Sequence, residues 1–179
     1  MMRSRYEGAQ TFAEFLAGVQ QNEELWHSLA RRAKVPDEYV ERVTRLPGKL
    51  HLLVLLEDWC GDAFNSVPYV AALADAAPNL DLRVLGRDAN PDLMDIHLTN
   101  GSRSIPVVMV FDDEFRELGW WGPRPKELQE WVLSEGLKLP PEERYAEVRR
   151  WYARDGGRTT LEEVVSLLEN TLAGAKAGN

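Results

Sequence analysis

The sequence contains a single cysteine, Cys60, at a position where a thiol could do chemistry. It follows an apolar run over 50–56 and precedes a helical pattern that begins at about Ala63. A thiol at the start of a helix faces unpaired backbone amides and the positive end of the helix dipole, and both favour the thiolate. Thiols in such positions have pKa values of roughly 3.5 to 7.5. Cys60 is therefore a candidate nucleophile, although a free cysteine is also often a small buried hydrophobic residue.

Carboxylates surround this thiol, since Glu57, Asp58 and Asp62 lie within three residues of it. Anions near a helix N-terminus are stabilised by the helix dipole, so we expect these acids to cap the helix. Close to a thiol they also oppose its ionisation, and the sequence leaves the balance open. His51 and His97 show no metal-ligand spacing with the acids, so we expect no metal site and no cofactor.

Strands and helices alternate around the cysteine. The near-continuous apolar run over 50–56 is typical of a strand buried on both faces of a sheet. The strands are expected over 50–56, 80–85, 107–111 and 115–121, and the last two form a hairpin. The helices are expected over 63–77, with a kink at Pro68, from Pro91 to about Leu98, and over 126–134. This order predicts a small α/β domain.

Helical patterns also precede and follow this part. Thr11 and Glu14 form a capping-box pattern, and apolar residues at helical spacing continue to Leu29, before a second helix over 37–45. Pro141 opens a later helix, and Thr159 with Glu162 is expected to cap a last one. We therefore predict an N-terminal helical extension (1–47), an α/β domain (48–136) and a C-terminal helical extension (137–179).

Composition limits the classes of partner and location. The 179 residues carry a formal net charge of −8, which argues against nucleic acid or an anionic membrane as the main partner. The most basic helix, with Arg149, Arg150 and Arg154 beside Trp151, is expected to present a solvated face. Residues 1–10 lack the apolar segment of a signal peptide, and no apolar run is long enough to span a bilayer. Because no signal segment is visible, we expect a cytoplasmic protein. One cysteine cannot form an intramolecular disulfide, so oxidation does not hold this fold together.

The residues around Cys60 resemble the thioredoxin family. The sequence over 59–61, Trp-Cys-Gly, resembles the first half of its Trp-Cys-Gly-Pro-Cys motif. Pro68 resembles the proline of its active-site helix, Ile105-Pro106 resembles the cis-proline segment that faces the cysteine, and Gly122 resembles a glycine beyond the hairpin. The resemblance covers about 50–133 in matching order, and it implies a thioredoxin fold, with a mixed central sheet flanked by helices, here with helical N- and C-terminal extensions.

A closer resemblance points to a subgroup of bacterial thioredoxin-like proteins. The segments 57–62 and 119–125 are similar to its two signatures, and the N-terminal helices and the segment 90–94 look similar as well. Membership of this subgroup implies the fold more strongly than the activity, because one fold serves many functions.

Three departures from the thioredoxin pattern bear on chemistry. Ala63 stands where thioredoxins have the second cysteine, Asp62 where they have proline, and Val54 where they have a buried acid. The thiol that resolves a mixed disulfide and the carboxylate that transfers a proton are therefore both missing. This excludes a dithiol reductase mechanism at this site, and any mixed disulfide on Cys60 would need an external thiol to release it.

Three functions remain open. In the first, Cys60 is a monothiol that exchanges with a protein or low-molecular-weight disulfide. The partner would dock beside Cys60 on Trp59, Gly61, Asp62, Ser104, Ile105 and Pro106. Arg103 and Ser104 could bind the carboxylate of a small thiol, although a solvated loop is the simpler interpretation of Arg103. In the second, the domain is a non-catalytic binding module. In the third, which the Asp62-Ala63 sequence disfavours, two copies and glutathione hold an iron–sulfur cluster.

Overall fold

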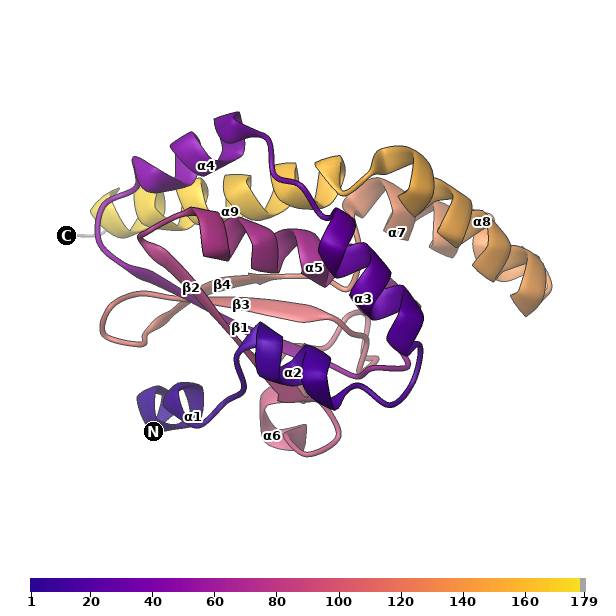
Figure 1. Cartoon of the computed structure of the whole chain (residues 1–179), viewed down its shortest axis with the longest axis horizontal. Helices are drawn as coiled ribbons and strands as arrows, with labels where there is room; N and C mark the ends of the chain where they lie inside the picture. The colour runs from indigo at the N-terminus through magenta and orange to yellow at the C-terminus, as the bar shows by residue number, and fades with distance from the viewer. Residues whose placement is uncertain (178–179) are drawn as a thin grey trace.

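A mixed four-stranded sheet forms the centre of the protein, as the computed structural model shows for residues 1–177 (Figure 1). The strands are β1 (Leu50–Leu56), β2 (Leu80–Gly86), β3 (Val107–Phe111) and β4 (Glu117–Trp121), in the spatial order β2-β1-β3-β4. β1 pairs in parallel with β2 and antiparallel with β3, and β3 pairs antiparallel with β4. The predicted thioredoxin fold, with a mixed sheet and helical extensions, is confirmed.

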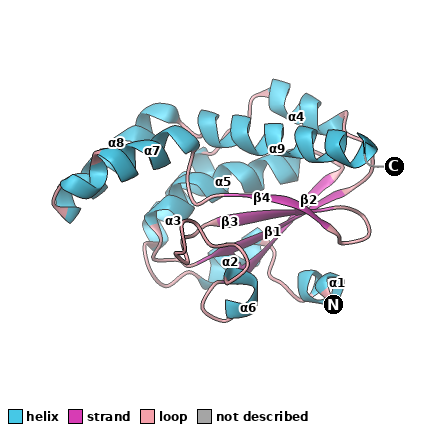
Figure 2. Ribbon diagram, turned by 180° about the vertical axis from the view of Figure 1, so that it is seen from behind, coloured by secondary structure: helices cyan, strands magenta, loops and turns pink. Residues whose placement is uncertain are grey.

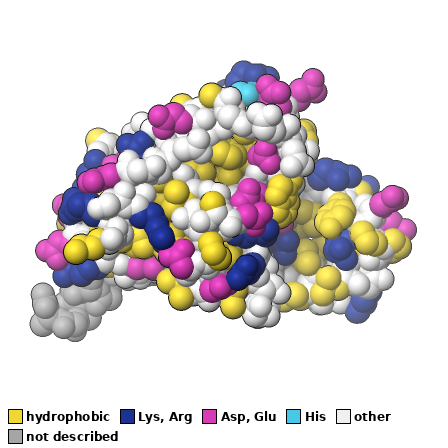
Figure 3. Space-filling view, turned by 90° about the horizontal axis from the view of Figure 1, so that it is seen from below, with side chains coloured by type: hydrophobic (Ala, Val, Ile, Leu, Met, Phe, Trp, Pro, Cys, Tyr) yellow, Lys and Arg dark blue, Asp and Glu magenta, His cyan; other side chains and the backbone are white. Residues whose placement is uncertain are grey.

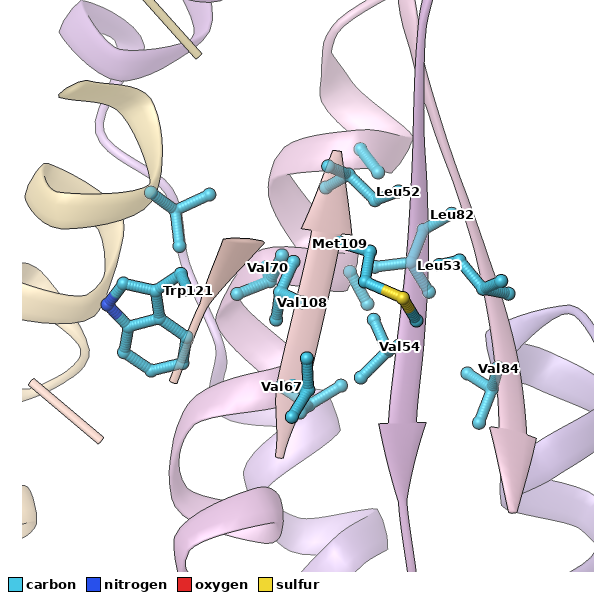
Figure 4. Packing of buried hydrophobic residues seen from close by; sticks show 14 of the residues in the cluster. Leu52, Leu53, Val54, Val67, Val70, Leu82, Val84, Val108, Met109 and Trp121 are labelled. Carbon is cyan, nitrogen blue, oxygen red and sulfur yellow. The ribbon is translucent and has the colours of Figure 1, made fainter. Parts of the chain in front are cut away.

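The two central strands are buried along their whole length because both of their faces are covered. Val54 pairs with Val84 on one side and with Val108 on the other, so aliphatic residues continue across the sheet. Figure 4 shows Val54 and Val108 beside Val67 and Val70, two buried residues of the helix that follows Cys60, and Val84 belongs to the same core. This packing fixes the end of β1, and with it the start of the loop that carries the cysteine.

The helices cover the sheet on both sides. In chain order they are α1 (Met2–Glu7), α2 (Phe12–Gly18), α3 (Glu23–Arg32), α4 (Asp37–Thr44), α5 (Gly61–Ala76), α6 (Pro91–Met94), α7 (Lys126–Ser134), the 3-10 turn η1 (Gly136–Lys138), α8 (Pro141–Asp155) and α9 (Arg158–Ala177). Figures 1 and 2 show α5, α9 and α4 on one side of the sheet, and α1 and α6 on the other. Within the described residues, no helix combines the length and apolar character needed to cross a membrane.

The two terminal extensions pack against the sheet and against each other. Trp26 of α3 is fully buried and contacts Phe64 of α5 edge to face, with ring centroids 6.1 Å apart. The guanidinium of Arg42 in α4 forms ion pairs with Glu162 and Glu169 of α9 at 2.8 and 2.7 Å. The extensions therefore share the core of the α/β part.

Two predicted helix ends are wrong, and in both cases a side chain makes a different bond. α6 ends at Met94, well before Leu98, because the following segment turns so that His97 can reach β4. The side chain of Asn90, which precedes α6, does not cap the helix and donates to the carbonyl of Gly86 at 2.8 Å. Thr159 does not cap α9, which already begins at Arg158, and its N–H and hydroxyl both donate to Asp155.

Buried His97 makes the stability of this region depend on pH. Its Nδ1 lies 2.7 Å from the carbonyl of Leu93 and its Nε2 lies 2.7 Å from a carboxylate oxygen of Glu117. Both neighbours are acceptors, so this geometry favours the protonated ring, in which both nitrogens donate. Burial alone would lower the pKa of His97, but the hydrogen bonds to Glu117 and Leu93 outweigh it and raise the pKa above its ordinary value.

We expect the protein to lose stability as the pH rises through the raised pKa of His97. A group with a raised folded-state pKa stabilises fully below its unfolded pKa, about 6.5 for histidine, and loses that contribution at higher pH. Urea unfolding between about pH 6 and pH 8.5 measures the effect. His97→Gln should flatten this part of the profile. An unchanged slope in that variant would assign the pH dependence to another group.

Candidate functional site

Cys60 occupies the N-cap position of α5, directly after the loop that leaves β1. The nearby backbone N–H groups of Asp62 and Ala63 lower the pKa of its thiol, but neither makes a capping hydrogen bond to the sulfur. The thiol itself donates to the carbonyl oxygen of Ile105, with Sγ and O 3.4 Å apart. The side chain is only 8% exposed. The sulfur therefore lies between the start of a helix and the segment before Pro106, as the sequence predicts, but more deeply buried than a reactive thiol.

Burial decides the charge state that the sequence leaves open. It raises the pKa of Cys60, and the nearby carboxylate of Asp62 raises it further. The N–H groups of Ala63 and Asp62 and the guanidinium of Arg124 act in the opposite direction, but the net pKa is about 11. The low pKa that a helix-start position favours is thus not what the structure indicates, because desolvation outweighs the backbone amides. Cys60 is a neutral thiol at pH 7.

Asp62 forms a polar cluster that extends from α5 to α8. Arg124 contacts both of its carboxylate oxygens, at 2.5 and 3.1 Å, and the hydroxyl of Tyr152 donates to one of them at 2.8 Å. Arg124 also donates to Gln129 of α7 at 2.6 Å. Because Asp62 is committed to these contacts, its main role is to fasten α8 and the segment after β4 onto the start of α5.

None of the three acids makes a capping hydrogen bond to α5, contrary to our expectation, although Asp62 lies in its first turn. The carboxylate of Asp58 accepts hydrogen bonds from the N–H groups of Gln20 and Gln21, and its carbonyl accepts one from the indole of Trp26 at 2.8 Å. Glu57 accepts a hydrogen bond from the N–H of Asp88 at 2.9 Å. Both acids therefore fix the loop before Cys60 to the segments on either side of it.

The segment that faces the cysteine is tightly packed. The Ile105–Pro106 peptide bond is cis, and Pro106 is buried. Gly122 lies directly against it with a φ of +133°, and a Cβ there would be 2.1 Å from the carbonyl oxygen of Pro106. Only glycine fits this close approach.

A pocket of about 470 Å³ opens beside Cys60. Six of the seven predicted site residues line it, namely Trp59, Cys60, Gly61, Asp62, Ser104 and Ile105. The seventh, Pro106, is buried and does not line the pocket. Sequence reasoning missed the residues that form the opposite wall, Tyr145, Val148 and Arg149 of α8, together with Arg87. The sequence singles out Arg149 as part of a basic helix, but nothing in it places that helix beside the cysteine. No group of three or more potential metal-ligating side chains comes together in the described residues.

Comparison with known proteins gives the family. Residues 9–146 match a family model described as thioredoxin. The chain belongs to the thioredoxin family. The match begins before α2 and ends inside α8, so it includes helices that precede the strands in the sequence and helices that follow them. The closer resemblance to one bacterial subgroup of the family stays a prediction.

Solved structures share the thioredoxin-family fold seen here. A crystal structure of a protein of unknown function from Pseudomonas aeruginosa superposes with a TM-score of 0.73 at 22% identity, covering 92% of this chain and 95% of that one. An HIV epitope scaffold superposes with the same TM-score at 21% identity, covering 94% and 97%. At these identities the likeness concerns the fold alone. None of the curated proteins compared with the chain matches it.

Within the thioredoxin fold, the missing redox groups are replaced by packing. Val54 and Ala63, which stand at the positions of the buried acid and the second cysteine, are both fully buried in the core. Figure 4 shows Val54 among aliphatic side chains. The site thus keeps the thioredoxin frame around one thiol, with a hydrocarbon core behind it.

Proposed function

We propose that this thioredoxin-family protein is a binding protein that holds a partner in the pocket beside Cys60 without thiol–disulfide exchange. One observation carries the proposal: the only thiol is buried and donates to the Ile105 carbonyl, and this burial raises its pKa. Exchange requires a thiolate and a second thiol. The high pKa also disfavours the cluster-binding hypothesis, since iron is held by thiolates.

The pocket has features that suit a protein partner. Trp59 is 42% exposed beside the cysteine, and the guanidinium of Arg87 lies 5.0 Å from the centre of its ring. A large exposed indole held in this way offers apolar contact area at a low cost in conformational entropy. Ser104 and Ile105 also line the pocket, beside the place where an extended segment of a partner would lie.

Monothiol exchange is the second candidate, and the position of the sulfur favours it. Cys60 lines the pocket, and the nearby backbone N–H groups of Ala63 and Asp62 favour its thiolate. After loss of its proton the sulfur would attack a disulfide of the partner, forming a mixed disulfide and expelling one thiolate. An external thiol would then attack the mixed disulfide, be oxidised in its turn and return Cys60 to the reduced state.

Alkylation of Cys60 by iodoacetamide distinguishes a protonated thiol from a reactive one. With a pKa of about 11, the thiolate fraction at pH 7 is roughly 300-fold below that of a free cysteine. The greater intrinsic nucleophilicity of a basic thiolate recovers roughly tenfold of this. We therefore expect alkylation at least about tenfold slower than for free cysteine, with a rate that still rises above pH 9. A plateau below pH 8 would contradict the proposal.

The partner itself tests the choice between the two functions. The protein and its Cys60→Ser variant are immobilised, and proteins retained from a cell extract are compared with and without dithiothreitol. A binding protein retains the same proteins with both forms, and dithiothreitol does not release them. Retention that needs Cys60 and is reversed by dithiothreitol would establish monothiol exchange instead.

A further inference from the structure

The pocket beside Cys60 is positively charged in a protein whose net charge is −8. Its lining includes the four arginines Arg87, Arg103, Arg124 and Arg149, against a single carboxylate, that of Asp62. Figure 3 shows Lys and Arg side chains in dark blue beside the hollow between the main body and the arm on the right, which contains α8. This concentration of cationic groups at one cavity calls for a ligand of opposite charge.

The four arginines differ in how firmly they are paired. Arg124 is held by Asp62 in a half-buried cluster, so its guanidinium is not free for a ligand. Arg87 and Arg103 pair with Asp88 and Asp95, and both of these acids are exposed. Ion pairs with exposed acids are weak, so a ligand carboxylate can compete for the guanidinium of Arg103. It can compete less freely for that of Arg87, which is 20% exposed and also donates to the carbonyl of Arg103.

Arg149 is the arginine most accessible to a ligand. It is exposed on α8, and none of the side chains that the structure describes forms an ion pair with it. Its neighbour Arg150, by contrast, is paired with Glu147 one turn earlier on the same helix and does not line the pocket. The C-terminal extension therefore brings an unpaired cation to the wall opposite Cys60.

From this arrangement we infer that the pocket binds an acidic segment of a partner protein. The inference rests on the proposed binding function and specifies its ligand. Carboxylates of the segment contact Arg149 and compete for Arg87 and Arg103. Its apolar side chains pack on Trp59, Tyr145 and Val148, of which the two aromatic residues are exposed. A volume of about 470 Å³ holds more than one small carboxylate, and cations on three separate segments match charges spread along a chain.

Calorimetric titration with a short peptide of alternating glutamate and leucine tests this inference. We expect binding that weakens several-fold between about 0.05 M and 0.3 M salt, and no binding when serine replaces glutamate in the peptide. Arg149→Gln should weaken binding about tenfold, the loss expected for one charge-assisted contact. The matched variant Arg150→Gln changes an exposed arginine of the same helix that does not line the pocket, and it should bind the peptide as the unmodified protein does. Circular dichroism verifies that both variants fold.

The outcomes separate the ligand from the function. The inference that the pocket binds an acidic segment is overturned if the glutamate peptide does not bind. It is also overturned if the Arg149 and Arg150 variants lose equal affinity for the peptide. The proposed binding function still stands in that case if the Cys60→Ser variant retains its partners. Equally tight binding of free glutarate would assign the pocket to a small acid and contradict a protein segment. Retention of partners that depends on Cys60 overturns the binding function itself, whatever the peptide does.

Discussion

Gly122→Ala is expected to destabilise the protein by about 3 kcal/mol or more, the largest effect of any methyl addition at its described glycines. The added Cβ would lie 2.1 Å from the carbonyl oxygen of Pro106, an approach that no side-chain rotation relieves because both groups are backbone. The φ of +133° adds strain for any residue with a Cβ. Relief requires the cis-proline segment to move away from β4, and this would also disturb the pocket wall at Ile105. Urea unfolding gives the change in free energy.

Gly48→Ala is the matched control for Gly122. Gly48 also has a positive φ, +75°, but nothing lies within 4 Å of a Cβ placed there. This variant therefore measures the conformational cost alone, about 1–2 kcal/mol. Equal losses in the two variants would show that the contact with Pro106 contributes nothing, and would contradict the packing described for this segment.

Removal of the Asp62 carboxylate is expected to change stability and thiol chemistry together. Asp62→Ala leaves the guanidinium of Arg124, which is 20% exposed, without its partner and removes the acceptor of the Tyr152 hydroxyl. Breaking a fully buried pair costs about 3–5 kcal/mol, and partial exposure reduces this to about 2 kcal/mol. The same change lowers the pKa of Cys60, because a negative charge beside the thiol is lost while Arg124 remains. Unfolding in urea and the pH dependence of alkylation measure the two effects.

Tyr152→Phe separates these effects. It removes one hydrogen bond to Asp62 and leaves the ion pair with Arg124 in place, so we expect a loss of about 1 kcal/mol. The alkylation profile of Cys60 should stay close to that of the unmodified protein, since the charge of Asp62 is kept. A profile that moves as far in Tyr152→Phe as in Asp62→Ala would show that the attachment of α8, not the charge, controls the thiol.

The parts of the fold that could be predicted are those whose signals are local. The strand over 50–56 is a continuous apolar run that stops at acids, and it lies where the sequence places it, as does the strand over 107–111. The last strand begins at Glu117, two residues later than predicted, because Phe115 belongs to the turn and has a φ of +60°. The helix after Asn90 could not be predicted to its end, because its length depends on a hydrogen bond from His97 to Glu117, twenty residues away. Contacts of this kind have no local signal.

The candidate site divides in the same way. The position of Cys60 at the start of a helix follows from the sequence, because a strand precedes it and a helical pattern follows. Its burial does not, since the Ile105 carbonyl that covers the sulfur belongs to a distant segment. The hydrogen bonds that Asp58 accepts from Gln20 and Gln21 and the placement of Arg149 depend on how the terminal helices pack against the sheet. Both lie beyond what residue types and spacing reveal.

The docking of the terminal helices also limits how this protein can be cut or recombined. A fragment reduced to 48–136 would lose Trp26 and the amides that hold Asp58, the carboxylate of Glu163 that accepts from the Trp121 indole, and the hydroxyl of Tyr152. The loop before Cys60 would lose these contacts, and the pocket would lose the part of its wall that Asn22, Tyr145, Val148 and Arg149 form. Chimeras that exchange only the sheet strands would therefore keep the sheet and lose the part of the pocket that α8 forms. The unit to transfer is the strand layer together with the helices that enclose it.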